Sequence, residues 1–91
     1  MIVYKYELPL GDLDENNQIV VRMPAGAQLL DVQVQNGSPV IWALVDTSRR
    51  LEPRTFEIVG TGHTLSTPPY RHIATFQMHG GALVFHAFEV L

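Results

Sequence analysis

The residues best suited to bind a ligand are several arginines and a glycine-rich turn. Arg49, Arg50 and Arg54 fall within six residues of one another, and Arg71 comes later. Arginine binds phosphate through two parallel hydrogen bonds, successive backbone N–H groups can cradle an anion, and an aromatic ring can stack on a base. This combination predicts a site for a small anionic, nucleotide-like ligand. The predicted site comprises Arg49, Arg50, Arg54, Gly60, Thr61, Gly62, His63, Tyr70, Arg71 and His79.

A simpler interpretation of the same residues is a strand-to-loop turn beside solvated arginines. The stretch 60–64 lacks the spacing and the following helix of a P-loop or a dinucleotide fingerprint. If the arginines do bind phosphate, replacing Arg54 by Ala should weaken binding about tenfold or more. The melting temperature should then stay nearly unchanged.

The four histidines, His63, His72, His79 and His86, are candidate metal ligands. A metal site needs imidazoles that converge on one ion. The expected strand pairing places His72 and His86 on opposite faces and His79 in a turn, so no metal site is predicted. His86 lies in an apolar stretch opposite Thr75 and needs a hydrogen-bond partner or a pocket. A satisfied core histidine and a pocket-lining histidine both remain open.

Residues for nucleophilic or acid–base catalysis are not recognisable. The serines fall in turns without a G-x-S-x-G context, and most acidic residues fall on turns and polar strand faces. We therefore expect no catalytic residue, no cofactor and no enzymatic activity. Cleavage of a nucleotide is kept as an alternative.

Composition narrows the classes of partner. The chain has 91 residues, a net charge of −3, 16% charged residues and no cysteine. An acidic chain is a poor binder of nucleic acid, and no apolar run is long enough for a membrane helix. A chain of this length forms one domain, here residues 1–91, and its low charge favours a homo-oligomer. The opening MIVYKYELPL lacks the features of a signal peptide, and we expect a cytoplasmic protein.

The element that organises the chain is a predicted hairpin over residues 30–45. Leu30–Gln35 alternates apolar and polar residues, Asn36-Gly37 suits a two-residue type I′ turn, and Val40–Val45 is apolar throughout. A two-residue turn fixes the strand register. The predicted pairs are Gln35 with Ser38, Val32 with Ile41, Asp31 with Trp42 and Leu30 with Ala43.

A second hairpin is predicted over residues 71–90, turning at Gly80-Gly81. Its pairs are Met78 with Leu83, Phe76 with Phe85, Ala74 with Ala87 and His72 with Glu89. Shorter strands are expected at 2–8, 18–23 and 54–59, with loops at 47–53 and, around two prolines, at 65–70. The prediction is all-β: a small antiparallel sandwich or curled barrel of about seven strands. The partner of the first strand is left open.

Several stretches resemble a family of small uncharacterised all-β proteins of phages and prophages. They are the opening YKYEL, the M-P-x-G-A turn at 23–27, VQVQNGSPVIWALVD, RTFEIVGTGH and FQMHGGALVFHAFE. The resemblance covers most of the chain in the same order. It implies a fold and a phage context, and it transfers no binding residue.

A phage context implies a protein that acts in the cytoplasm of a bacterial host cell. Small accessory proteins of phages include oligomers that sequester nucleotide immune signals. The leading hypothesis is therefore a non-enzymatic protein that sequesters a nucleotide-like ligand and so counters host defence. The first alternative is an interaction module: a virion accessory or a host-protein binder. This alternative predicts an exposed apolar patch in place of a pocket for an anionic ligand.

Overall fold

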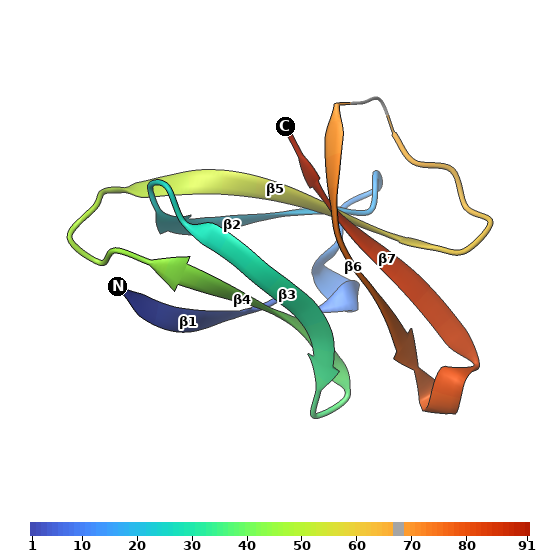
Figure 1. Cartoon of the computed structure of the whole chain (residues 1–91). Helices are drawn as coiled ribbons and strands as arrows, with labels where there is room; N and C mark the ends of the chain where they lie inside the picture. The colour runs from blue at the N-terminus through green and yellow to red at the C-terminus, as the bar shows by residue number, and fades with distance from the viewer. Residues whose placement is uncertain (67–68) are drawn as a thin grey trace.

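The computed structural model describes residues 1–66 and 69–91, and it is all-β, as predicted (Figure 1). Its seven strands are β1 (Ile2–Glu7), β2 (Gln18–Pro24), β3 (Gln28–Gln35), β4 (Ser38–Val45), β5 (Leu51–Gly60), β6 (Tyr70–Met78) and β7 (Leu83–Val90). One antiparallel sheet has the order β1-β4-β3, and the other has the order β2-β5-β7-β6. Short 3₁₀ turns, η1 (Leu10–Asp12) and η2 (His79–Gly81), complete the described elements. The two sheets form an open sandwich and do not close into a barrel.

The hairpin of β3 and β4 turns at Asn36 and Gly37, whose φ angles of 54° and 82° suit the predicted turn. Three predicted pairs are observed: Gln35–Ser38, Val32–Ile41 and Asp31–Trp42. The fourth is wrong, because Leu29 and not Leu30 pairs with Ala43. Leu30 is the extra residue of a β-bulge, which shifts the register by one position.

In the hairpin of β6 and β7, the predicted pairs near the turn are observed, and the predicted pair furthest from the turn is not. The pairs Met78–Leu83, Phe76–Phe85 and Ala74–Ala87 are observed. The pairing of His72 with Glu89 is wrong, because His72 faces Phe88 and Arg71 faces Glu89. A second bulge at Ile73 causes the shift. One extra residue reverses the face of His72 relative to the predicted pairing.

Strand β5 begins earlier than predicted, at Leu51, so the expected loop over 47–53 is too long. Pro53 lies within the strand, opposite Arg22 of β2. The pairing of β5 with β7 starts only at Thr55, so β5 has one neighbour at Pro53, and a sheet tolerates a proline there. The expected extended loop over 65–70 includes residues 67 and 68, which lie outside the described residues.

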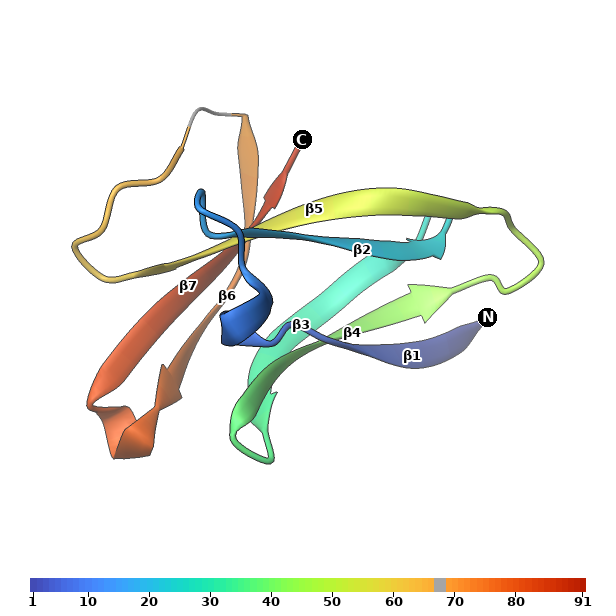
Figure 2. The same cartoon turned by 180° about the vertical axis from the view of Figure 1, so that it is seen from behind.

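The core fills the space between the sheets, where both views place β2 and β5 across from β1 and β4 (Figure 2). Its largest fully buried side chains come from both sheets and from the connection after β1, and include Phe56, Phe76, Leu8, Met23 and Ile41. The first strand pairs with β4, which settles its placement. Within the described part of the chain, no helix is long and apolar enough to cross a membrane.

Candidate functional site: a cationic cavity between the sheets

A cavity of about 180 Å³ opens where the edge strands of the two sheets meet. Strand β3 is the edge of one sheet, β6 is the edge of the other, and the two strands contact each other. Both bulges line the cavity, through Leu29 and Leu30 on β3 and through His72 and Ile73 on β6. Arg54 and Arg71, two of the predicted ligand-binding residues, also line it.

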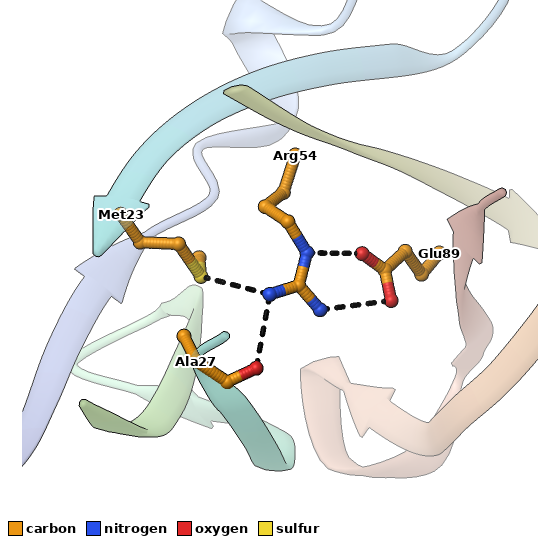
Figure 3. Close-up of polar contacts among 4 residues, drawn as sticks. All are labelled: Met23, Ala27, Arg54 and Glu89. Atoms are coloured by element: carbon orange, nitrogen blue, oxygen red, sulfur yellow. Dashed lines mark hydrogen bonds and ion pairs between the residues drawn. The ribbon is translucent and has the colours of Figure 1, made fainter. Parts of the chain in front are cut away.

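Arg54 lines this cavity, and Figure 3 shows its polar contacts with Met23, Ala27 and Glu89. Its Nε donates to Glu89 Oε2, and its Nη2 donates to Glu89 Oε1 at 3.1 Å. Its Nη1 donates to the carbonyl oxygen of Ala27 at 2.9 Å and lies 4.0 Å from the sulfur of Met23. The side chain of Arg54 is 20% exposed and that of Glu89 is 6% exposed. Arg54 therefore links β5, where it lies, to β7 and to the residue just before β3.

The charge of Arg54 is fixed by this arrangement. The hydrogen bond that Arg54 donates to Glu89 raises the pKa of Arg54 above its ordinary value, against the opposing effect of burial. The two charges nearly cancel each other, so this pair alone offers little net charge to a ligand. Guanidinium nevertheless has five N–H donors, and the four contacts above leave one of them, on Nη2 of Arg54, for a bound group.

Arg71 supplies the uncompensated charge of the cavity. It pairs with Glu89 in the strand register, and it is exposed. The ion pairs found among residues 1–66 and 69–91 are Arg50 with Glu52 and Arg54 with Glu89, so Arg71 has no carboxylate within salt-bridge distance there. Two arginines against one glutamate leave the cavity with one net positive charge, which suits a single anionic group.

The other predicted arginines do not join this cavity. Arg49 and Arg50 lie in the connection before β5, and Arg50 contacts Glu52 at 3.0 Å. The Gly60–His63 turn follows the opposite end of the same strand. Ten residues of strand span about 30 Å, so the arginines at one end and the turn at the other cannot hold one small ligand.

The glycine-rich turn lines a second cavity, of about 360 Å³, at the far end of β5. Gly60, Thr61 and His63 form one wall, and Ala82–Phe85 form the other. Two backbone N–H groups of the turn are already used, since Thr61 donates to Val84 and His63 donates to Gly60. The turn is therefore poorly prepared to cradle an anion. His79 lies nearby in the chain, in the η2 turn before Ala82, and is exposed.

A chain of hydrogen bonds joins the rims of the two cavities. His86 Nε2 lies 2.7 Å from the hydroxyl of Thr61, and its Nδ1 lies 2.9 Å from that of Thr75. Thr75 lies in turn 3.1 Å from His72 Nε2. The prediction that Thr75 faces His86 is confirmed, and His86 has the hydrogen-bond partners that it needed. The expectation that His72 and His86 lie on opposite faces is wrong, because the bulge at Ile73 brings His72 to the face of Thr75.

Tyr70 lies apart from Arg71, against Phe88, with ring centroids 5.7 Å apart. Its hydroxyl is buried and has no hydrogen-bond partner among the described residues. The described part of the chain also contains no group of three or more His, Asp or Glu side chains that could hold a metal ion. Of the ten predicted site residues, the structure thus brings Arg54 and Arg71 to one cavity and Gly60, Thr61 and His63 to another.

These features define a small all-β protein of two sheets with a cationic cavity between its edge strands. The chain belongs to the domain of unknown function family DUF7352, which matches residues 1–91. No curated protein and no solved structure matches the chain. The resemblance to an uncharacterised family is thereby confirmed, whereas a phage origin stays a prediction.

Proposed function

We propose that the protein binds a small anionic, nucleotide-like ligand in the cavity between β3 and β6 and holds it without turning it over. The observation that carries this proposal is the exposed Arg71, which adds an unbalanced charge beside the Arg54–Glu89 pair. Charge-assisted hydrogen bonds contribute about 1.5–3 kcal/mol each, so a few of them support useful affinity.

The size of the cavity suggests how such a ligand would lie. At about 180 Å³ it is smaller than a typical ligand pocket of roughly 300–1,000 Å³. It suits a phosphate or carboxylate beside Arg71, with the rest of the ligand over the rim. A base or a sugar at the rim would contact the apolar side chains of Leu30 and Ile73 and the imidazole of His72.

Sequestration of a nucleotide immune signal is the biological role that we propose, in the cytoplasm of a bacterial host cell. The support is the resemblance to phage proteins together with the net charge of the cavity. Binding without chemistry suits a role in which the signal is removed by stoichiometric capture.

The test is native mass spectrometry of protein purified from cells that express a nucleotide-signalling defence system. Calorimetry with cyclic dinucleotides and ADP-ribose derivatives then measures affinity. Arg71→Ala should weaken binding about tenfold or more, with an unchanged melting temperature, because its side chain is exposed. Arg49→Ala, an exposed arginine of the connection before β5, is the matched control and should bind as the wild type does. Equal affinity of the Arg71 variant, or no retained nucleotide, would contradict the proposal.

Cleavage of a nucleotide bound in the second cavity is a second candidate function, favoured by the hydrogen bonds around His86. A hydroxyl, a histidine and a group that orients the histidine form the arrangement of an activated nucleophile. Thr61, His86 and Thr75 stand in this order, and Thr61 lines the second cavity. Recovery of a modified nucleotide in the same experiment would favour cleavage, whereas an intact and stoichiometric nucleotide would favour capture.

A further inference from the structure

We propose that strand β1 is the contact surface for a second copy of this chain. Two β1 strands would pair antiparallel about a two-fold axis, joining two three-stranded sheets into one continuous sheet of six. The inference rests on the exposed apolar side chains of β1, on the direction of its backbone N–H and C=O groups, and on the side chains that would face each other across the two-fold axis. It does not depend on the proposed ligand.

Strand β1 is unusually exposed for an apolar strand. Ile2, Val3 and Tyr4 are 49%, 52% and 41% exposed, although they alternate between the two faces of the sheet. One edge of β1 pairs with β4, and the other edge is the free margin of its sheet (Figure 1). A free edge with large apolar side chains is a template for pairing with another strand.

The other three edge strands carry features that hinder such pairing. Strands β3 and β6 each contain a bulge, and they contact each other. Strand β2 carries the exposed Arg22 and ends at Pro24. Bulges, prolines and exposed charges are the usual protection of sheet edges, and β1 has neither of the first two.

Strand β1 carries two charged residues: Glu7 is its last residue, and Lys5, in the middle of the strand, is directed away from its free edge. Lys5 Nζ donates to Gln35 Oε1 at 2.7 Å, and Gln35 belongs to β3, on the far side of β4. The ammonium group therefore reaches back across its own sheet. It does not guard the free edge against an approaching strand.

The hydrogen bonds inside the sheet identify which backbone groups of β1 remain available. Leu8 donates its N–H to the carbonyl of Pro39 at 2.9 Å, just beyond the last β1–β4 pair. Backbone groups of an antiparallel strand alternate in direction, so those of Tyr4 and Tyr6 also point to β4. The N–H and C=O groups of Val3 and Lys5 therefore point to the free edge.

Of the registers that satisfy these groups, two pair five residues of β1 with five of the partner strand, and one of those two avoids a clash of charge. With Tyr4 opposite Tyr4 of the partner subunit, Val3 faces Lys5 of the partner subunit and they exchange backbone hydrogen bonds. Ile2 then faces Tyr6 of the partner subunit. Tyr4 and Tyr6 already form an edge-to-face pair, with centroids 6.4 Å apart, so the four tyrosines would form one cluster. In the other of these two registers, Lys5 would lie opposite Lys5 of the partner subunit, and this pair of like charges is unfavourable.

Sedimentation and matched substitutions test the interface. Wild type should dimerise, and Val3→Lys should raise the dimer dissociation constant about tenfold or more, because it adds two lysine–lysine pairs. Val20→Lys is the control: Val20 lies on the edge strand β2 and is 58% exposed, similar to Val3. It should leave the dissociation constant unchanged.

Cysteine cross-linking tests the register, since the chain contains no cysteine of its own. In the proposed register the two Tyr4 residues face each other without exchanging backbone hydrogen bonds. Such pairs have Cα atoms about 4.5 Å apart, which permits a disulfide. Tyr4→Cys should therefore form an oxidised dimer, whereas Ile2→Cys should not, because the two Ile2 positions would lie about 13 Å apart. A monomeric wild type, equal effects of the two lysine variants, or faster cross-linking through position 2 would overturn the proposal. A dimer without any nucleotide would refute the ligand and leave this interface standing.

Discussion

Replacing Glu89 by Gln should destabilise the fold strongly, because it leaves the charge of Arg54 without its carboxylate. Removing one partner of a buried ion pair costs about 3–5 kcal/mol. Arg54 is 20% exposed and lines a cavity, so water can partly solvate it and the lower end, about 3 kcal/mol, is expected. This differs from the expectation drawn from the sequence, in which Arg54 could be removed at little cost in stability.

The size of the effect can be expressed as a melting temperature. An unfolding entropy of roughly 2.1 cal/mol/K per residue amounts to about 0.19 kcal/mol/K for a chain of 91 residues. A loss of about 3 kcal/mol should then lower the melting temperature by about 15 °C. Arg54→Met should cost a similar amount at neutral pH, since it leaves Glu89 buried without a partner.

The double variant Arg54→Met/Glu89→Leu separates the charge effect from loss of packing. It leaves no buried charge, and its main loss is the hydrogen bond to the carbonyl of Ala27, worth about 1 kcal/mol. Urea unfolding followed by the fluorescence of Trp42, the single tryptophan, gives the free energies of unfolding of wild type, of Glu89→Gln, of the single variants Arg54→Met and Glu89→Leu, and of the double variant. Two results would refute the reasoning: a loss below about 1 kcal/mol for Glu89→Gln, or a double variant as unstable as the sum of its single variants.

Two further predictions concern Glu57 and Gly37. Burial alone would raise the pKa of Glu57, but hydrogen bonds from Gln18 and Ser66 lower it below the ordinary value of 4.5. The ionised Glu57 therefore stabilises the fold above pH 4.5, and this stabilisation is lost as the pH falls through the lowered pKa of the folded state. Urea midpoints at neutral and acid pH should therefore differ less for Glu57→Gln than for wild type or for a Glu15→Gln control, and an unchanged difference would contradict the assignment. Gly37 has a φ of 82°, so Gly37→Ala should cost about 1 kcal/mol in urea unfolding, whereas Gly11→Ala, whose added Cβ meets no atom within 4 Å, should be nearly neutral. Equal costs at the two glycines would count against a strained turn at position 37.

Local patterns were sufficient to predict both hairpins of the fold. Alternation of polarity and the dipeptide at 36–37 act over neighbouring residues, and the pairs closest to each turn are observed. The pairing of β1 with β4 and of β5 with β2 and β7 depends on contacts between residues far apart in the chain. The start of β5 was missed because Pro53 was taken as a loop residue, and only the one-sided pairing there shows why a proline fits.

The arrangement of the expected site residues could not be predicted from the sequence. Arginines and glycines near one another in sequence were expected to meet, but a straight strand of ten residues, β5, separates Arg50 from the Gly60 turn. Arg54 and Arg71, two of the residues expected to bind a ligand, line one cavity. The buried carboxylate of Glu89 was missed as the partner of Arg54, because their contact depends on the pairing of β5 with β7, which joins segments far apart in the chain.

The two bulges explain why the predicted strand register is wrong close to the candidate site. In β3 the alternation is interrupted by two successive apolar residues, Leu29 and Leu30, and in β6 by Ile73 and Ala74. A regular strand would turn one residue of each doublet toward solvent, whereas a bulge lets both approach the same side. The doublets were therefore the signal, in the sequence, for the two irregular positions. Because the edges that carry the bulges contact each other, both extra residues, Leu30 and Ile73, line the cavity. The bulge at Ile73 also brings His72 to the face of Thr75.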